Sequence, residues 1–250
     1  MTGATGYLGR EMCWALARAG AEVLVNSRIA EKAEAFAAEL RQAGFAATPA
    51  PFDVVDEEAI TAFVDSRAGS PLHVLVNNAY AGVGGTIETS NSEQFRTSYE
   101  MTVISANQIL QATLPLLRGA IAESGDASVI NICSMYGVVS PDLRVYETPE
   151  GSNPPFYGAA KAAFIQYTRY AACEFGPEGL RVNAIAPGPF PSHSVQEADP
   201  QFVKTLAAKV PMRRIGSAAE IGGPVVFLAS SLSTYVNGAV LPVDGGWTAW

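Results

Sequence analysis

Gly3-Ala4-Thr5-Gly6-Tyr7-Leu8-Gly9 is the stretch that decides the fold, because its glycines open an amphipathic helix expected over 8–19. Glycines at a strand-to-helix turn allow a tight bend. They also let a pyrophosphate approach the free amides at the helix N-terminus, where the dipole favours anions. Glycine turns before helices are common, so the rest of the chain must support this interpretation. The residues expected to contact a dinucleotide here are Gly3, Thr5, Gly6, Tyr7 and Leu8.

No apolar β run precedes this turn, although a doubly wound sheet would place a strand there, at its centre. Without that strand, the edges of its two neighbours would be exposed. We therefore expect the polypeptide to begin several residues upstream of Met1, with a first strand that this numbering lacks. The alternative is that another segment of the chain fills the gap.

Short β-branched runs alternate with longer Ala-rich amphipathic stretches along the chain. Strands are expected at 22–26, 46–52, 73–77, 128–133, 181–186 and 239–243. Helices are expected at 8–19, 30–43, 57–68, 92–122, 156–175, 200–208 and 218–230. Apolar strands between helices are typical of a parallel sheet covered on both faces. The pattern predicts one α/β domain over 1–250, with a single doubly wound parallel sheet of the Rossmann type and helices on both faces.

The composition and the charge balance exclude several classes of protein. Hydrophobic residues make up 48% and charged residues 16%, which is typical of a globular chain rather than a disordered one. A formal net charge of -8 provides no basic surface, so neither nucleic acid nor a membrane is an expected partner. No apolar run is long enough to span a bilayer and no signal peptide is evident, so we expect a cytoplasmic protein.

Cysteine and histidine usage gives no sign of a metal site. The three cysteines, Cys13, Cys133 and Cys173, lie within apolar segments and are interpreted as buried thiols in a reducing compartment. The two histidines form no Cys/His cluster, so a catalytic zinc is not expected.

The residues after the strand at 22–26 predict which dinucleotide is bound. A carboxylate there would hold the ribose 2′-hydroxyl of NAD(H). The chain has Ser27 followed by Arg28, and a guanidinium suits a 2′-phosphate through charge-assisted, bidentate hydrogen bonds. The alternative for Arg28 is a solvated surface charge. We predict NADP(H) in preference to NAD(H).

Two further strand ends carry residues suited to a nucleotide groove. Asp53 could hold an adenine amino group while Val54 covers the ring face, and Asp53 is equally a candidate N-cap for the next helix. Asn77-Asn78-Ala79 ends the following strand, where the amides could tie adjacent strands and line the groove. A purely structural turn is the alternative for Asn78 and Ala79.

Tyr157 and Lys161 lie four residues apart in the helix expected at 156–175, so their side chains share one face. A neighbouring ammonium favours the phenolate and would lower the pKa of Tyr157 from about 10 toward neutrality, the range suited to a general acid/base. Ser134, at the end of a strand, could hydrogen-bond the same substrate oxygen. A chance Tyr-x-x-x-Lys pair is the alternative, and the accompanying motifs argue against it.

These motifs together resemble the short-chain dehydrogenase/reductase family over essentially the whole chain. The resemblance rests on the glycine turn, Asn77-Asn78-Ala79, Ser134, Tyr157-x-x-x-Lys161, Arg181-Val182-Asn183-x-Ile185-x-Pro187-Gly188 and Asp244-Gly245-Gly246. Each motif is weak alone, and their order and spacing together are strong. The resemblance implies a nicotinamide cofactor and hydride transfer between a carbonyl and a secondary alcohol carbon.

The resemblance also implies a role for individual residues. Tyr157 is the acid/base, Ser134 positions and polarises the substrate oxygen, and Lys161 lowers the pKa of Tyr157 and holds the nicotinamide ribose. Pro187 and Gly188, with the nearby Ser192 or Ser194, border the nicotinamide carboxamide.

Several features depart from the family pattern. The G-x-x-G-x-x-G spacing is more like the extended branch, although the chain length and the C-terminal half are like the short branch. Thr102 stands where the family usually has a catalytic Asn, and its hydroxyl would have to bind the water of the proton relay; Asn107 would face a different way. Tyr80 replaces a glycine after Asn-Asn-Ala and adds bulk beside the cofactor or the substrate.

The departure with most bearing on the substrate is an insertion at 140–155, which leaves Ser134 and Tyr157 23 residues apart. We expect a substrate-side lid with Arg144 and Tyr146 as its contacts, because a guanidinium can clamp an anion and a phenol ring can stack on a sugar face. This composition predicts a polar, hydroxyl-rich or anionic substrate. The segment resembles family members found with bacterial surface-sugar biosynthesis and the gluconate dehydrogenase-like group. The alternative is a solvated loop that touches no substrate.

The sequence therefore predicts an NADP(H)-dependent oxidoreductase acting on a polar, possibly sugar-like carbonyl or alcohol. One alternative keeps the fold and changes the chemistry, to an epimerase, a dehydratase or a dehalogenase; Lys161 and the glycine turn argue against the dehalogenase. Another alternative is a non-catalytic cofactor-sensing protein. Members of this family are usually oligomers, and Trp247 and Trp250 at the C-terminal end would form an unusual apolar patch on a monomer. We therefore expect a homo-oligomer, a tetramer or a dimer.

Overall fold

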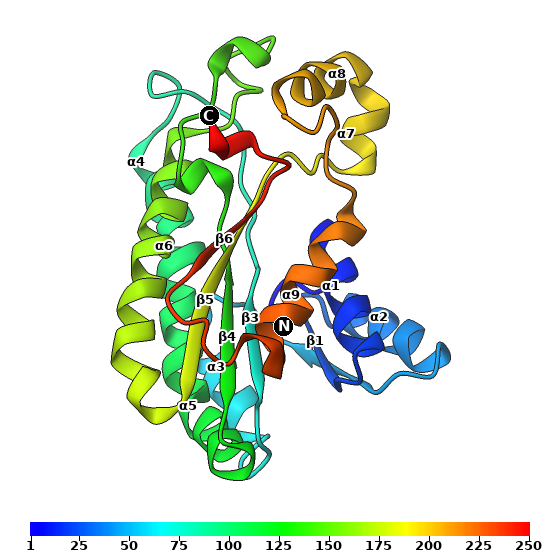
Figure 1. Ribbon diagram of the computed structural model, residues 1–250, viewed down its shortest axis with the longest axis vertical. Coiled ribbons are helices and arrows are strands. Elements are labelled where there is room, and N and C mark those ends of the chain that lie inside the picture. The colour runs from blue at the N-terminus through cyan, green and yellow to red at the C-terminus, as the bar shows by residue number, and fades with distance from the viewer.

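Six strands, all paired in parallel, and nine α-helices make up the computed structural model, which describes residues 1–250 (Figure 1). The strands are β1 Val23–Ser27, β2 Ala47–Pro51, β3 Val74–Asn77, β4 Ala127–Ile132, β5 Leu180–Pro187 and β6 Val240–Val243. The helices are α1 Tyr7–Arg18, α2 Ala30–Gln42, α3 Glu57–Asp65, α4 Ser92–Tyr99, α5 Ser105–Ser124, α6 Pro155–Phe175, α7 His193–Ala198, α8 Pro200–Lys209 and α9 Gly222–Ala229. None of these helices is long and apolar enough to cross a bilayer.

Every predicted strand is present, and two predicted helices differ from the structure. The helix expected at 92–122 is interrupted by a π-helical turn, Glu100–Ile104 (η1), which separates α4 from α5. The helix expected at 218–230 begins with a 3₁₀ turn, Ala218–Ile221 (η5), before α9. Periodicity cannot detect either change, because the apolar spacing continues through one altered turn. Helix α7 was not predicted from the sequence.

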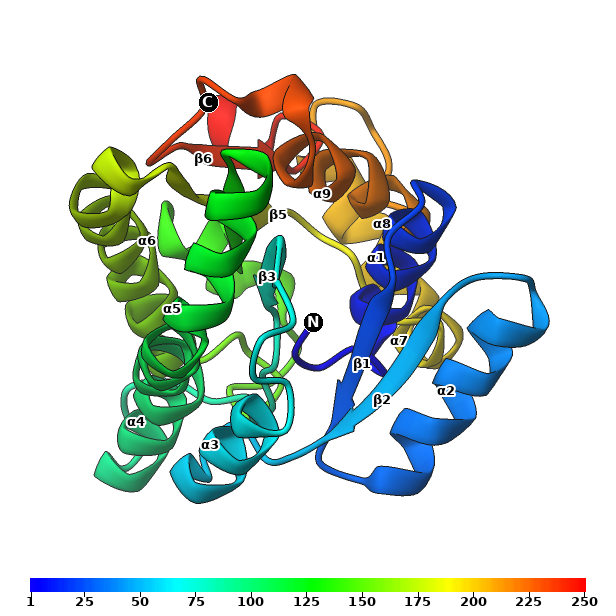
Figure 2. The ribbon, with the colours of Figure 1, turned by 90° about the horizontal axis from the view of Figure 1, so that it is seen from below.

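The sheet is divided into two parts, which differs from the single sheet expected from the sequence. Strands β1 and β2 form one pair, and β3, β4, β5 and β6 form the other sheet in that order. The segment Met1–Ala4 runs between β1 and β3 and bonds to both: the Thr2 amide donates to Val76 and the Ala4 amide to Asn26. Figure 2 shows the N-terminus between the two parts. These first residues therefore join the two sheets toward the carboxyl ends of their strands.

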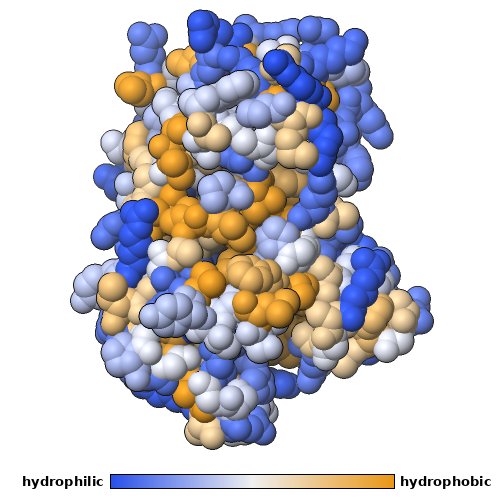
Figure 3. Space-filling model, viewed as in Figure 1, coloured by the Kyte–Doolittle hydropathy of each residue, from blue (hydrophilic) through white to orange (hydrophobic).

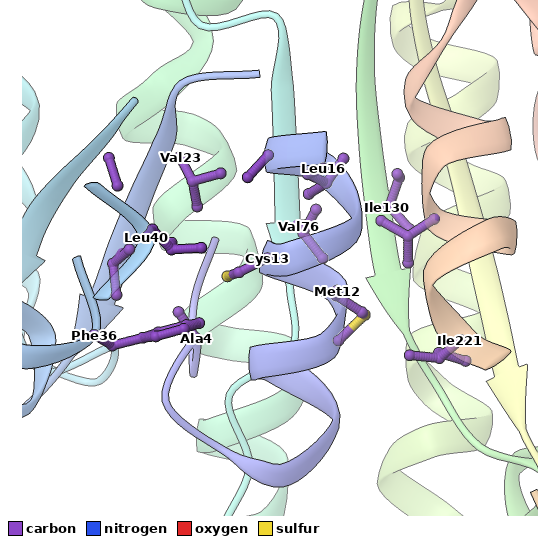
Figure 4. Packing of buried hydrophobic residues seen from close by; sticks show 14 of the residues in the cluster. Ala4, Met12, Cys13, Leu16, Val23, Phe36, Leu40, Val76, Ile130 and Ile221 are labelled. Carbon is purple, nitrogen blue, oxygen red and sulfur yellow. The ribbon is translucent and has the colours of Figure 1, made fainter. Parts of the chain in front are cut away.

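Helices cover both faces of the sheet because side chains alternate between the faces along each strand. On β4, Ile130 packs on one face in a cluster with Met12 of α1 and Ile221 next to α9 (Figure 4). Val129 points to the other face, into a cluster with Leu117 of α5. Figure 2 shows the same division, with α1, α2 and α9 on one side and α3, α5 and α6 on the other. The predicted Rossmann-type arrangement with two covered faces is confirmed.

The cysteines agree with the prediction at two of three positions. Cys13 and Cys133 are buried, and Cys173 is exposed. Cys173 follows the buried pair Ala171 and Ala172 on α6 and therefore turns onto the solvent side of that helix.

A substitution at Gly9 tests how closely α1 approaches the turn that precedes it. A Cβ at this position would lie 2.2 Å from the carbonyl oxygen of Gly3, which is backbone and cannot move aside. We expect Gly9→Ala to lower the free energy of unfolding by about 1–3 kcal/mol, the usual scale of overpacking. The matched control is Gly119→Ala in the middle of α5, where the nearest atom would lie at 4.0 Å. There the change should stabilise the protein by about 0.5–1 kcal/mol. Urea unfolding compares the two, and an unchanged or raised stability for Gly9→Ala would refute the close approach.

Candidate active site

A groove of about 520 Å³ crosses the carboxyl ends of the strands in both parts of the sheet. At such a switch point of an open α/β sheet, strand ends and helix N-termini converge and ligands bind. The predicted cofactor-binding residues all line this groove: Gly3, Thr5, Gly6, Tyr7, Leu8, Ser27, Arg28, Asp53, Val54, Asn78, Ala79, Tyr157, Lys161, Pro187 and Gly188. Ser134 and Tyr80 line it as well, whereas Thr102, Ser192 and Ser194 do not.

The glycine turn is clamped by asparagine side chains from two strands. The Gly3 amide donates to the side-chain Oδ1 of Asn26 on β1 at 3.2 Å, and the side-chain Nδ2 of Asn78, just after β3, donates to the Gly3 carbonyl at 3.0 Å. Gly3 has φ +59°, a conformation that glycine adopts without strain. No side chain caps the N-terminus of α1 at Gly6, so its first amides are available to an anion.

The side-chain amides of Asn77 and Asn78 in the Asn77-Asn78-Ala79 motif have separate structural roles. The Asn77 side chain donates to Asn131 of β4 at 2.9 Å, and Asn131 in turn donates to Thr168 of α6 at 2.9 Å. This buried chain ties β3, β4 and α6 together, as the sequence suggested for Asn77. Asn78 holds the glycine turn instead, so the motif couples the sheet to the nucleotide groove.

The far end of the groove carries the residues expected around the adenosine ribose. Ser27 ends β1, and its hydroxyl accepts from the Ile29 amide at 3.2 Å. Arg28 and Lys32 both line the groove, and Lys32 adds a second cation that sequence reasoning missed. Its position in the first turn of the helix that follows Arg28 was the available signal. Asp53 does not cap α3; that cap is Asp56, whose carboxylate accepts from the Ala59 amide at 2.9 Å.

Ser134, Tyr157 and Lys161 meet at the opposite end of the groove, where β4 ends and α6 begins. Ser134 starts the turn Met135–Gly137 (η2), and its hydroxyl accepts from the Tyr136 amide at 3.1 Å. Lys161 is 4% exposed and donates to the carbonyl of Ile132 at 2.8 Å. Its ammonium lies 5.6 Å from the ring centroid of Tyr157 and 5.3 Å from that of Tyr80.

The pKa of Tyr157 is shifted in the direction opposite to the one expected from the sequence. Burial raises the pKa of Tyr157 to about 12, and the interaction with the Ser134 hydroxyl opposes the shift without overcoming it. Burial likewise lowers the pKa of Lys161 to about 8. The expectation was wrong because it counted the positive charge and not the cost of burying a phenolate, while the Lys161 ammonium is bound to a strand carbonyl.

Thr102 lies in the π-helical turn η1, a distortion that occurs frequently at functional sites. Its side chain is 3% exposed, and its hydroxyl has no hydrogen-bond partner. Asn107, five residues further along, accepts from the Tyr167 hydroxyl at 3.2 Å. Asn107 therefore does not replace Thr102, in agreement with the prediction from the spacing.

A second cavity of about 330 Å³ opens beside the groove. Tyr80 and Tyr157 line both spaces, so the two meet at these phenol side chains. Tyr146, from the insertion at 140–155, and Phe202 of α8 also line the second cavity. The rings of Tyr146 and Phe202 lie 5.6 Å apart. This arrangement places the predicted substrate residues Tyr80 and Tyr146 at one cavity.

Arg144, the third predicted substrate residue, does not line either cavity. Its side chain is 89% exposed and makes two hydrogen bonds to the Asp142 carboxylate, at 2.9 and 3.0 Å. Lys209 of α8 pairs with the same carboxylate. The sequence could not show this, because it does not reveal that α8 returns beside the insertion.

The insertion is fastened to the body of the protein and is not a loosely solvated loop. The hydroxyls of Tyr136 and Tyr146 are hydrogen-bonded at 3.2 Å, and the Gly85 amide donates to Ser152 at 3.0 Å. Phe202, Lys209 and Gly85 come from segments far away in the sequence. They carry no motif, and so the sequence analysis missed them.

Comparison with known proteins identifies the family. The family model described as enoyl-(acyl carrier protein) reductase matches residues 3–248. Galactitol 2-dehydrogenase (L-tagatose-forming) of Cereibacter sphaeroides is 33% identical, over 100% of this chain and 94% of its own. Cis-4-hydroxycyclohexanecarboxylate dehydrogenase of Sinomonas cyclohexanicum is 32% identical, over 100% and 95%. The solved structure of gluconate 5-dehydrogenase from Burkholderia cenocepacia, with NADP and tartrate, has a TM-score of 0.86 at 30% identity, covering 100% of this chain and 94% of that one.

These similarities extend over the whole chain and agree with the groove and the motifs already described. The protein belongs to the short-chain dehydrogenase/reductase family. It is an oxidoreductase of the class that acts on CH–OH groups with NAD(P).

The lowered pKa of Lys161 makes stability depend on pH. A lysine with a folded pKa of about 8 and an unfolded pKa of 10.5 binds fewer protons when folded between these values. The free energy of unfolding therefore rises as the pH rises through about 8, and the gain is complete near 10.5. Between pH 7 and pH 9.5 the protein should gain about 2 kcal/mol relative to Lys161→Met. The exposed Lys204→Met serves as a control and should follow the parent protein. Urea unfolding at both pH values measures this, and identical pH profiles for Lys161→Met and the parent would show that Lys161 is not buried as a charge.

Proposed function

We propose that the protein is an NADP(H)-dependent oxidoreductase that interconverts a carbonyl and a secondary alcohol on a polar, hydroxylated, sugar-like substrate, with Tyr157 as general acid/base. The observation that carries the proposal is the position of Tyr157, which borders both the groove and the second cavity. A proton donor at this junction faces a substrate on one side and a dinucleotide on the other. Relatives named for galactitol and for a hydroxycyclohexane acid support a polar alcohol as the substrate.

The residues that line the groove are suited to bind a nicotinamide dinucleotide phosphate. Gly3 and Gly9 allow the turn to pack closely against the rest of the protein, since side chains at either position would strike its backbone atoms. The uncapped amides of α1 would bind the phosphates, and Arg28 with Lys32 would hold the 2′-phosphate. The solved relative with bound NADP supports this choice. When bound, the nicotinamide ring supplies or accepts the hydride.

Proton transfer is the task of Tyr157. Because burial raises its pKa to about 12, the phenol carries its proton at neutral pH. In the reductive direction Tyr157 donates that proton to the substrate oxygen as hydride reaches the carbonyl carbon, and in the oxidative direction it takes the proton back. Ser134 would hold the same oxygen by a hydrogen bond, and Lys161 would bind the nicotinamide ribose.

Thr102 would complete the proton path behind Lys161. The π-helical turn η1 packs against α6, the helix that carries Lys161, and the buried Thr102 hydroxyl has an unused hydrogen-bonding capacity. A water bound to that hydroxyl would pass protons between Lys161 and solvent, the role that the family usually gives to an Asn.

Replacing Tyr157 tests the acid/base role directly. Tyr157→Phe removes only the transferable proton, so we expect kcat to fall about 10²–10⁴-fold while the Kd for NADPH stays nearly unchanged. Tyr170→Phe on the same helix is the control, because this side chain is 68% exposed and lines neither cavity. Stopped-flow nicotinamide absorbance and a cofactor titration give both numbers. Near-full activity of Tyr157→Phe would exclude Tyr157 as the proton donor.

Cofactor preference tests the position of Arg28. Arg28→Ala should weaken NADPH binding by about 1–3 kcal/mol, the scale of a charge-assisted hydrogen bond, and leave NADH binding almost unchanged. Arg96→Ala on α4 is a control, since Arg96 is exposed and lies outside the groove. Titration of both cofactors with all three proteins measures this. Equal affinity of the parent protein for NADPH and NADH would contradict the assignment of NADP(H).

We also propose that the protein is a homo-oligomer, a dimer or a tetramer. Strand β6 is an edge strand that pairs only with β5, and Figure 3 shows hydrophobic residues gathered over this part of the surface. Leu232, Tyr235 and Trp250 are also highly exposed, at 77%, 103% and 75%. Such surfaces are unusual on a monomer. Light scattering should give a multiple of the 26.3 kDa chain mass, and a mass equal to one chain would exclude the assembly.

A further inference from the structure

The ammonium of Lys161 is buried without a carboxylate beside it. Lys161 is 4% exposed and belongs to none of the ion pairs of the structure. Its hydrogen bond goes to the carbonyl of Ile132 at 2.8 Å. A cation that leaves water without a counterion loses its hydration, and other groups must offset that loss.

Three aromatic rings surround this ammonium and form what we call the aromatic cage. The Nζ atom of Lys161 lies over the rings of Tyr80, Tyr157 and Phe164, at 5.3, 5.6 and 5.8 Å from their centroids. A cation within about 6 Å of a ring face is attracted by the ring quadrupole, and the attraction grows where water is excluded. Tyr157 and Phe164 share helix α6 with Lys161, whereas Tyr80 follows β3. Tyr80 therefore closes the cage from a separate part of the fold.

The hydroxyl of Tyr80 fixes its ring in this position. Ser98 of α4 is 2% exposed, and its hydroxyl donates to the carbonyl of Phe156 at 3.1 Å. A serine hydroxyl has one hydrogen, so Tyr80 is the donor in its 3.2 Å hydrogen bond with Ser98. Phe156 directly precedes Tyr157 in the first turn of α6. The phenol of Tyr80 is thus anchored through α4 to the turn that carries Tyr157.

The chain around Tyr80 is shaped to hold a phenol. A Cβ at position 82 would lie 2.8 Å from the Tyr80 hydroxyl, so Gly82 provides the space for that group. The ring of Tyr80 also lies 4.9 Å from that of Tyr157 at 67°, an edge-to-face contact. Members of the family usually have a glycine in place of Tyr80, so this wall of the cage is a feature of this chain.

We propose that Tyr80 is a positioning residue that acts through Lys161: its ring face holds the ammonium in the charged form, and its bond to Ser98 keeps the ring in place. This role rests on the proposed function, in which Lys161 binds the nicotinamide ribose beside Tyr157. A neutral amine would offer fewer donors and no charge at this point.

The margin for keeping this charge is small. Burial lowers the pKa of Lys161 to about 8. A further fall of about one pH unit would leave about half of the molecules without the charge at pH 7. The titratable groups that face Lys161 are the Cys133 thiol directly after β4 and the phenols of Tyr80 and Tyr157. Burial raises the pKa of all three, to about 12 for Cys133 and Tyr157, so they are uncharged near pH 8 and the titration belongs to Lys161.

The titration of Lys161 tests the proposal without a substrate. The chain has four lysines, Lys32, Lys161, Lys204 and Lys209, so ¹³C-labelled lysine gives a simple NMR spectrum in which Lys161→Met assigns the buried one. The pKa of Lys161 is read from its ¹³Cε shift in the parent protein and in Tyr80→Leu, which keeps apolar bulk and removes the ring face. The pKa should fall in Tyr80→Leu by about 0.5–1.5 pH units, the scale of a partly desolvated cation–π contact. Tyr80→Phe and Ser98→Ala break the same hydrogen bond and keep the ring, so both should give a smaller fall.

Matched variants separate the ring from general disturbance. Tyr80→Met is a second variant without the ring and should reproduce the fall. Tyr99→Leu removes an exposed phenol of α4 that lines neither cavity, and it should leave the pKa of Lys161 unchanged. Constant pKa values of the other lysines show that an effect is local, and cooperative urea unfolding shows that each variant is folded.

An unchanged or raised pKa of Lys161 in the folded variants without the ring would overturn the proposal. A fall in Tyr80→Phe as large as that in Tyr80→Leu would overturn it as well, because the ring would then not be the group that holds the charge. Either result would leave the proposed function standing, since no substrate enters the experiment. Full activity of Tyr157→Phe would instead contradict the proposed function without altering the titration of Lys161.

Discussion

The clamp on the glycine turn is the interaction on which the rest of the structure depends. Asn26 and Asn78 reach from two separate strands and bond the amide and the carbonyl of the same residue, Gly3. The segment Met1–Ala4 is also where the two parts of the sheet are joined by backbone hydrogen bonds. The clamp therefore sets the position of α1 relative to both sheets and aims the free amides of its first turn into the groove. Small side chains alone would not suffice, because the polar backbone of the turn needs these partners.

At the other end of the groove, burial governs the chemistry. Lys161 is held under the strand end by the Ile132 carbonyl and covered by the rings of Tyr80 and Tyr157. This low-dielectric setting raises the pKa of the phenol from 10.0 to about 12 and lowers the pKa of the ammonium from 10.5 to about 8, so the two pKa values move apart. Burial therefore keeps the proton on Tyr157 at neutral pH and makes Lys161 lose its proton more easily than a solvated lysine does. The neighbouring ammonium does not bring the pKa of Tyr157 toward neutrality.

The insertion at 140–155 has two chemically different sides. Its charged residues face solvent or pair with one another and with Lys209, whereas Tyr146 and Asn153 face the second cavity. Contacts with α8 through Phe202 hold the insertion in this orientation. A segment that is rich in charge along the sequence thus contributes uncharged residues to the wall of the second cavity. The sequence predicted Arg144 as a substrate contact, and the tertiary structure pairs this residue with Asp142 outside the cavity.

What the sequence determined by itself was local or came from spacing. The glycine turn, the alternation of strands and helices, and Tyr157 four residues before Lys161 predicted the fold class and the residues that line the groove, because strand ends in a parallel sheet converge at one edge. The tertiary structure decided what depends on contacts between distant segments. The pKa of Tyr157 follows from burial. Arg144 lies outside the second cavity because it pairs with Asp142, which also binds Lys209. The wall of that cavity includes Phe202 from α8. Burial and long-range pairing leave no periodic or spaced signature in the chain, so only the folded protein reveals them.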